Sequence, residues 1–119
     1  MTITLGSLTL VAEDMSAMLR FYNAVFDANF QPSEILAGHQ TYLGTIAGIR
    51  VVLCPNALVQ IDAVRNRHQL HFVVSDIHAV MAEALANGGS ILDEVKDVHG
   101  KLMGAVYDPD RNSMVFVQG

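Results

Sequence analysis

Apolar residues alternate loosely with polar ones over residues 3–12, a pattern that predicts a β-strand. Asp14 follows this strand and suits the start of a helix, because its carboxylate can accept hydrogen bonds from the free backbone amides there. The residues after it are apolar at spacings of three and four, which predicts a helix over about 15–27 with one buried stripe. That stripe consists of Met15, Met18, Leu19, Tyr22 and Phe26.

The same order of elements returns in the second half of the chain. A strand is predicted over about 67–75, and Asp76 follows it, 62 residues after Asp14. Two copies of one unit in a chain of 119 residues predict two modules that face each other, with a ligand site between them. The apolar stripe of the second helix consists of Ile77, Val80, Met81, Ala84 and Leu85.

Three further strands are predicted after each helix. In the first half, Pro32 lies in an irregular stretch over residues 29–38 that forms either an edge strand or a loop. Residues 39–46 and 49–54 then predict a hairpin around Ala47-Gly48.

In the second half, Asn87-Gly88-Gly89 supplies left-handed residues that end the helix. Asp108 to Asn112 forms a tight turn before the last strand. Each half is therefore βαβββ, and the fold class is α+β rather than a doubly wound sheet. The last three strands are expected at about 90–95, 102–107 and 113–118.

Residues 56–66 separate the two halves, because Pro55 ends the strand before them. Leu58, Val59 and Ile61 are apolar enough to cover something, so this segment is either a linker or a flap. We expect a single domain over residues 1–119. Its first module covers about 1–55 and its second module about 67–119.

The chain contains fewer charged residues than a typical domain. Charged residues make up 16% of the chain and apolar residues 51%, against about 25% and 45–50% in typical domains. This imbalance predicts apolar surface hidden either in a subunit interface or in a large apolar pocket.

The charge pattern narrows the expected partners. The net charge of −5, with Lys and Arg scattered singly, argues against nucleic acid and anionic membrane as partners. No apolar stretch approaches the ~20 residues of a membrane span. The first residues lack the features of a signal peptide, and Cys54 is the only cysteine, so the expected location is the cytoplasm.

Three segments of the chain resemble the glyoxalase/bleomycin-resistance/extradiol-dioxygenase family, also called the vicinal oxygen chelate proteins. They span nearly the whole chain in the family's order. The resemblance implies two βαβββ modules that form an open, eight-stranded, barrel-like sheet around a cleft, usually completed by a homodimer. An unrelated duplicated α+β domain, such as a ferredoxin-like pair, is the alternative. The segments are Val11-Ala-Glu-Asp14-Met with Phe21-Tyr22 and Val25-Phe26, Phe72-Val-Val-Ser-Asp76-Ile with Gly88-Gly89, and Asp108-Pro-Asp-Arg-Asn112.

The resemblance also implies where a metal would bind. Enzymes of this family hold a divalent metal with about four ligands, two from each module. In each module one ligand is a His or Gln seven residues before the capping aspartate, and the other is a Glu or His on the last strand. Here the first two positions hold Ser7 and Gln69, and the last strands, 49–55 and 113–118, contain no histidine or carboxylate. We therefore expect no resident metal or other cofactor, with a non-standard divalent site around His71 as the remaining alternative.

Residues on equivalent strand faces form the predicted ligand site. Alternation along a strand puts Ser7, Thr9 and Val11 on one face of the first strand. In the same way it puts Gln69, His71 and Val73 on the equivalent face of the second module's first strand. Tyr42 either stacks on a ligand or fills the core. Such a cleft combines apolar walls with neutral polar groups, which suits a small, largely apolar or aromatic molecule. The predicted binding set is Ser7, Thr9, Val11, Tyr42, Gln69, His71, Val73 and Val115.

These residues favour a small-molecule binding protein that acts as a homodimer. The alternative is an enzyme, namely a lyase, isomerase or dioxygenase that uses His71 as general base. A third possibility is a subunit whose main role is association with another protein.

Overall fold

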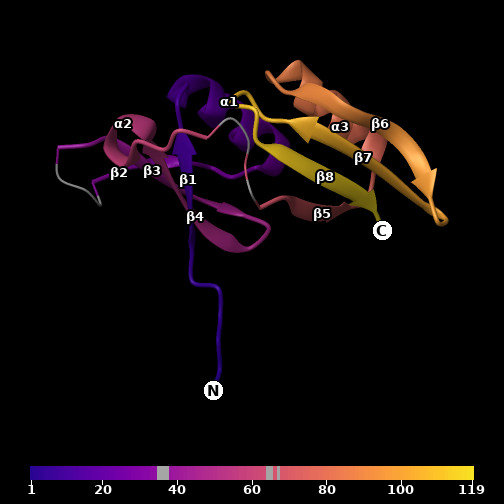
Figure 1. Cartoon of the computed structure of the whole chain (residues 1–119), viewed down its shortest axis with the longest axis horizontal. Coiled ribbons are helices and arrows are strands. Elements are labelled where there is room, and N and C mark those ends of the chain that lie inside the picture. The colour runs from indigo at the N-terminus through magenta and orange to yellow at the C-terminus, as the bar shows by residue number, and fades with distance from the viewer. Residues whose placement is uncertain (35–37, 64–65, 67) are drawn as a thin grey trace.

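Two four-stranded sheets, each with one helix after its first strand, form the molecule (Figure 1). The computed structural model describes residues 1–34, 38–63, 66 and 68–119. Sheet A has the order β1-β4-β3-β2 and sheet B the order β5-β8-β7-β6, so the predicted βαβββ duplication is confirmed. Sheet A contains β1 (Leu8–Ala12), β2 (Gln31–Ser33), β3 (Thr41–Ile46) and β4 (Ile49–Pro55), and sheet B contains β5 (Leu70–Val74), β6 (Ser90–Val98), β7 (Lys101–Tyr107) and β8 (Ser113–Gln118).

The first and last strands of each module, in sequence order, pair in the same way. β1 runs parallel to β4, and β5 runs parallel to β8, whereas the other neighbours are antiparallel. Among the described residues no ladder joins β1 to β5. The predicted eight-stranded sheet is therefore two open four-stranded sheets.

The helices α1 (Met15–Phe26) and α3 (Ile77–Ala86) begin at the two predicted caps. The Asp14 carboxylate accepts from the amide of Ala17 at 3.2 Å, and the Asp76 carboxylate accepts from the amide of Ala79 at 3.1 Å. One member of the predicted stripes is wrong: Leu85 is 47% exposed on α3.

One hydrophobic core is shared by both modules. Phe21 of α1 and Leu53 of β4 belong to the same buried cluster as Phe116 of β8. The ring of Phe26 lies 4.7 Å from that of Phe72 on β5, so aromatic contacts also cross between the modules. The sheets are therefore held together by a common interior.

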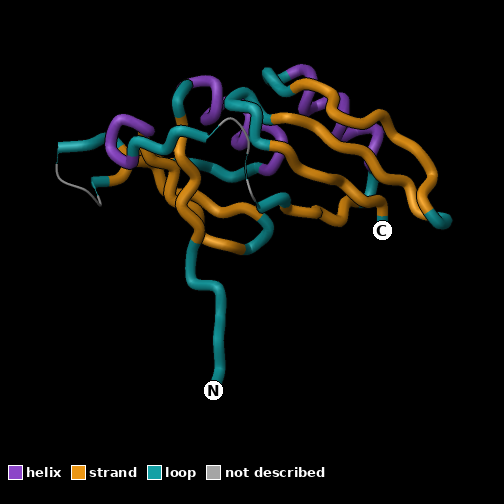
Figure 2. The backbone as a smooth tube through the Cα atoms, viewed as in Figure 1, coloured by secondary structure: helices purple, strands orange, loops and turns teal. Residues whose placement is uncertain are grey.

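The first predicted strand is shorter than expected. Leu8 is its first paired residue and lies opposite Val51, so in this register Gly6 would lie opposite Ile49, where β4 begins. Residues 1–5 therefore run past the end of sheet A, and we call residues 1–7, which precede the first paired residue, the arm. They extend away from the body of the molecule (Figures 1 and 2).

The hairpin turns follow the predicted chemistry, with one addition. Ala47 and Gly48 have φ of 51° and 79°, the left-handed pair that a tight hairpin requires. A second such pair at His99 and Gly100 allows β6 and β7 to extend further than predicted. Pro32 lies in β2 at an edge of sheet A, where its missing amide hydrogen costs no ladder bond.

The end of α3 corrects a second prediction. Only Gly88 has the left-handed conformation, with φ of 97°, whereas Asn87 has φ of −117° and Gly89 has no positive φ. A Cβ atom at Gly89 would lie 2.7 Å from the Phe21 ring and 2.9 Å from two backbone oxygens. Gly89 is therefore required by close packing.

The segment between the modules contains a short helix, α2 (Asn56–Val59), that the sequence pattern did not predict. The Asn56 side chain closes the turn after it, accepting from the amide of Ile61 at 2.8 Å and donating to its carbonyl at 3.1 Å. Parts of three predicted segments, residues 35–37, 64–65 and 67, lie outside the described residues. Of the described helices, none is long and apolar enough to cross a membrane.

Candidate functional site

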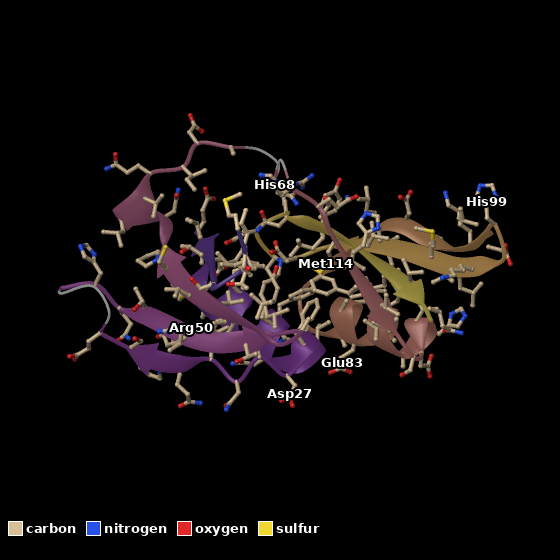
Figure 3. All side chains as sticks on the ribbon, turned by 90° about the horizontal axis from the view of Figure 1, so that it is seen from below. Asp27, Arg50, His68, Glu83, His99 and Met114 are labelled. Carbon is tan, nitrogen blue, oxygen red and sulfur yellow. The ribbon has the colours of Figure 1, made fainter. Side chains whose placement is uncertain are left out.

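A cavity of about 440 Å³ lies between the two modules. Sheet A lines it through β1, β3 and β4, and sheet B through β5 and β8. Tyr22 of α1 and Leu5, which precedes β1, also line it. Figure 3 shows Met114, one of its lining residues, near the middle of the molecule, between the two sheets. The main apolar lining residues are Leu8, Leu10, Val51, Leu70, Phe72 and Met114.

The cavity contains polar groups but no side chain with a fixed charge. Among the described residues that line it there is no Asp, Glu, Lys or Arg. Its walls therefore combine apolar surface with a few hydrogen-bonding groups, as small-molecule sites do. These groups belong to Thr9, Tyr22, Asn66, His68, His71, Asn112 and Ser113.

Strand register explains which side chains reach this cavity. Leu8 lies beside Val51 in sheet A, and Leu70 lies beside Met114 in sheet B, so each pair shares a face of its sheet. These pairs are at the positions that alternate with Thr9 and His71. The sequence analysis predicted the ligand set on one face of these strands. The cavity is lined mainly by the other face.

The structure brings only part of the predicted ligand set to this cavity. Thr9 and His71 line it, and Thr9 and Val11 line a neighbouring cavity. Tyr42 lies beside Leu53, on the face of sheet A that packs against the core. Val115 lies beside His71 in sheet B, and together with Ser7, Gln69 and Val73 it lines neither cavity.

The apolar residues Leu70, Phe72 and Met114 were missed as lining residues. Tyr22 was recognised only as part of a helix stripe. A sequence signal existed for each, because all are apolar or aromatic at positions that face the modules' shared interior. The pattern did not say which of two apolar strand faces borders a cavity.

The neighbouring cavity, of about 610 Å³, is lined in part by the segment between the modules. Ile61 and Ala63 of this segment line it together with Val11 of β1. The two cavities adjoin, because both are lined by Thr9, Leu10, Asn66, His68 and Asn112. Figure 3 shows His68 at the end of this segment.

Hydrogen bonds anchor the segments around both cavities. The side-chain oxygen Oδ1 of Asn66 accepts from the backbone amide of Ser113 at 3.0 Å, and the side-chain NH₂ group of Asn66 donates to the backbone carbonyl of Ser113 at 3.1 Å. The Asp110 carboxylate accepts from the amides of Glu13 and Asp14 at 2.7 and 3.1 Å. The turn before β8 is thereby tied to the loop between β1 and α1.

A buried polar pair forms part of the interior wall. The Tyr22 hydroxyl donates to the Asp108 carboxylate at 2.7 Å, and that carboxylate also accepts from Asn112 and from the amide of Asp110. Burial, followed by the charge of Asp108, raises the pKa of Tyr22 well above 10.0. Burial also raises the pKa of Asp108, because the lost hydration outweighs these hydrogen bonds.

The residues at the family's metal positions do not fit a divalent ion. Ser7 offers a neutral hydroxyl, and β4 and β8 carry no histidine or carboxylate. Across the described ranges, no three His, Cys, Asp or Glu side chains come together in a way that could hold a metal. His71 has no acidic partner in its ladder, where it lies beside Val115.

The fold and this site define a two-module α+β protein with an apolar cavity between its modules. The model of the glyoxalase-like domain matches residues 7–117, so the chain belongs to that family. No curated protein matches the sequence significantly.

Solved structures share this fold at low sequence identity. A hypothetical protein from S. aureus superposes with a TM-score of 0.83 at 16% identity, over 99% of this chain and 95% of that one. A glyoxalase/bleomycin resistance protein/dioxygenase family enzyme from Burkholderia phytofirmans PsJN gives 0.77 at 19% identity, over 98% of both chains. The fosfomycin resistance protein FosX from Listeria monocytogenes gives 0.77 at 18%, over 100% of this chain and 93% of that one. At such identities the likeness establishes the fold alone.

Proposed function

We propose that this protein binds a small, uncharged, largely apolar or aromatic molecule in the cavity between its modules. The observation that carries the proposal is an apolar cavity of about 440 Å³ with no fixed charge on its described walls. Cavities of roughly 300–1,000 Å³ with a few polar groups are typical of small-molecule sites. The fold shared with a fosfomycin resistance protein supports a small molecule as the ligand, and the uncharged walls of the cavity argue for its apolar character.

Three further features belong to this proposal. The protein works without a resident metal or cofactor, because Ser7 stands at one of the family's ligand positions and the last strands, 49–55 and 113–118, carry no histidine or carboxylate. It acts as a homodimer, which accounts for the shortage of charge and for exposed apolar side chains such as Val73, 76% exposed. It acts in the cytoplasm, which suits a single cysteine that lies buried in β4.

A matched pair of probes tests the proposal. We expect 1-naphthol to raise the melting temperature and 1-naphthoate, which has the same rings and a negative charge, to have little effect. Saturation to about 100 times Kd stabilises a protein by about 2.7 kcal/mol. Calorimetric titration of 1-naphthol then gives the affinity directly.

Two variants with equal starting exposure locate the site. Leu70 lines the cavity and Leu85 lies on α3, and both are 47% exposed. Leu70→Asp places a charge at the cavity and should weaken 1-naphthol binding at least about tenfold, or 1.4 kcal/mol. Leu85→Asp should bind as the parent does. Equal binding by both variants, or no response to 1-naphthol, would contradict the proposal.

The enzyme alternative has one specific observation in its favour, which is that the imidazole of His71 lines the cavity. A general base of this kind supports a lyase, isomerase or dioxygenase. Metal analysis of the purified protein distinguishes the two functions. Stoichiometric Fe, Mn, Ni or Zn that is lost in His71→Ala would favour the enzyme and contradict the binding protein.

A further inference from the structure

The cavity between the modules and the neighbouring cavity have part of their walls in common. The common residues come from β1, from the segment between the modules and from the turn before β8. Since the two cavities adjoin along this shared wall, one elongated molecule can contact both. The shared wall consists of Thr9, Leu10, Asn66, His68 and Asn112.

The polar side chains of the shared wall differ in how far the chain itself uses their hydrogen-bonding capacity. Both ends of the Asn66 amide bond to the backbone of Ser113. Among the described residues, the Thr9 hydroxyl and the His68 imidazole make no hydrogen bond, and the Asn112 amide uses only its NH₂ group. Three polar groups of the shared wall are therefore available to a ligand.

The Asn112 side chain is held in one orientation by the Asp108 carboxylate. Its NH₂ group donates to one carboxylate oxygen at 2.9 Å, and its backbone amide donates to the other at 2.9 Å. An ionised carboxylate only accepts hydrogen bonds, so the NH₂ end of the amide faces Asp108 and the oxygen end faces away from it. The Asn112 oxygen is thus an acceptor for a donor group in the middle of a ligand.

The neighbouring cavity has charged residues of both signs in its wall, unlike the cavity between the modules. The Glu13 carboxylate is 3.5 Å from the NH₂ group of Asn56, and the Asp110 carboxylate already accepts from two backbone amides. The Arg111 guanidinium lies 5.4 Å from the centre of the Tyr107 ring. A ligand group with a fixed charge is repelled by one sign and attracted by the other. Hydroxyl groups suit this wall better, because they donate to a carboxylate and accept from a guanidinium.

We infer that the ligand is an elongated, uncharged amphiphile that occupies both cavities. Its apolar rings lie in the cavity between the modules, and its hydroxylated tail lies in the neighbouring cavity. The Asn112 oxygen accepts from the group that joins the two parts, and the Glu13 carboxylate accepts from a hydroxyl of the tail. This inference rests on the proposed function and adds the second half of the ligand.

Two probes that share one ring system separate the contribution of the tail. The first is 3-(1-naphthyloxy)propane-1,2-diol, which we call the diol. The second is 1-(2-methoxyethoxy)naphthalene, whose chain has the same length but no hydrogen-bond donor. Calorimetric titration of the full chain with each probe, and with 1-naphthol, measures the three affinities.

Two glutamate variants test where the tail binds. Glu13→Met removes the acceptor at similar side-chain length and should weaken binding of the diol by about three- to tenfold. The same variant should bind 1-naphthol and the methoxyethoxy probe as the parent does. Glu83→Met is the matched control and should leave all three affinities unchanged. Glu83 is exposed like Glu13 and accepts from an asparagine side chain, Asn87, at 3.0 Å, but it lies on α3 and lines neither cavity.

Nuclear Overhauser effects to labelled methyl groups give the position of each half of the diol. Met114 lines only the cavity between the modules, and Ala63 lines only the neighbouring cavity. We expect the naphthalene protons to contact the Met114 methyl and the tail protons to contact the Ala63 methyl. Tail contacts to Met114, or no contact to Ala63, would overturn the inference.

The outcomes separate this inference from the proposed function. If 1-naphthol binds and Glu13→Met binds the diol as tightly as the parent does, the two-cavity ligand is wrong and the proposed function stands. If 1-naphthol, the diol and the methoxyethoxy probe all fail to bind, both are wrong.

Discussion

Tyr22 and Asp108 are two buried titratable residues that hydrogen-bond to each other. Tyr22 is 5% exposed and Asp108 is 2% exposed, and their hydrogen bond joins α1 of one module to the turn before β8 in the other. Removing the hydroxyl leaves a buried carboxylate with one donor fewer. Hydrogen bonds to charged groups are stronger than those between neutral groups.

We predict that Tyr22→Phe lowers the free energy of unfolding by about 1.5–3 kcal/mol near neutral pH. The raised pKa of Tyr22 means that the folded state holds the phenol proton more tightly than the unfolded state does. The hydroxyl's stabilisation is therefore complete below about pH 10 and is lost as the pH rises through the folded-state value. Urea unfolding from about pH 7 to about pH 11 should show the parent and Tyr22→Phe converging at the alkaline end. A stability difference that stays constant over this range would contradict the assigned role.

Residue identity predicted some of these roles and not others. Asp14 and Asp76 were predictable as caps, because an aspartate before an apolar helical stripe has a local geometric purpose. The partner of Tyr22 was not predictable, since Asp108 is 86 positions away in the chain. Contacts at such separation depend on how the modules pack, which no local pattern encodes.

At the scale of elements, the junction of α3 and β6 depends on two glycines with different physical roles. Gly88 needs its left-handed conformation, and its surroundings leave ordinary contact distance to Pro109. Gly89 needs its missing side chain, because a Cβ atom would lie 2.9 Å from the carbonyl oxygens of Ala84 and Tyr107. Backbone atoms cannot move aside as the end of a flexible side chain can.

We predict that Gly89→Ala destabilises the protein by about 3 kcal/mol or more, through overpacking at the end of α3. Gly88→Ala should cost about 1–2 kcal/mol, the strain of a left-handed alanine. Gly100→Ala is the control, since that hairpin glycine is left-handed with open space around it and should resemble Gly88→Ala. Chemical denaturation followed by circular dichroism measures all three. Equal losses at Gly88 and Gly89 would show that packing does not set the requirement.

Helices and hairpins were the elements that the sequence predicted best. Spacings of three and four specify one buried helix face, and Ala47-Gly48 suits one kind of turn. Strand alternation was less informative, because both faces of β1 carry apolar residues, namely Leu8 and Leu10 on one and Val11 on the other. The pattern over residues 3–7 was strand-like as well, but a strand also needs a neighbour, and sheet A ends before the arm.

At the scale of the whole molecule, the duplication places a cavity between the two modules but does not specify a ligand for it. The two modules meet through a common core, and the cavity lies where their strands β1, β4, β5 and β8 approach one another. The fold is shared with solved structures at 16–19% identity, whereas Ser7 and the strands β4 and β8 offer no histidine or carboxylate to a metal. Fold therefore follows from apolar patterning, which tolerates substitution, whereas chemistry depends on a few side chains that do not.

The shared core leads us to expect that the two modules fold as a single unit. Phe21 and Tyr22 of the first module are buried in the same cluster as Val106 and Phe116 of the second, so neither sheet retains its interior when the other unfolds. We predict that the most protected amides of β4 and β8 exchange hydrogen with the same free energy of opening, equal to the global free energy of unfolding. Hydrogen exchange followed by mass spectrometry, over a series of low denaturant concentrations, measures both values. Tyr22→Phe should lower the two by equal amounts, since the change acts on the common interior. Two distinct opening energies, with only one of them lowered by Tyr22→Phe, would mean that the modules unfold independently.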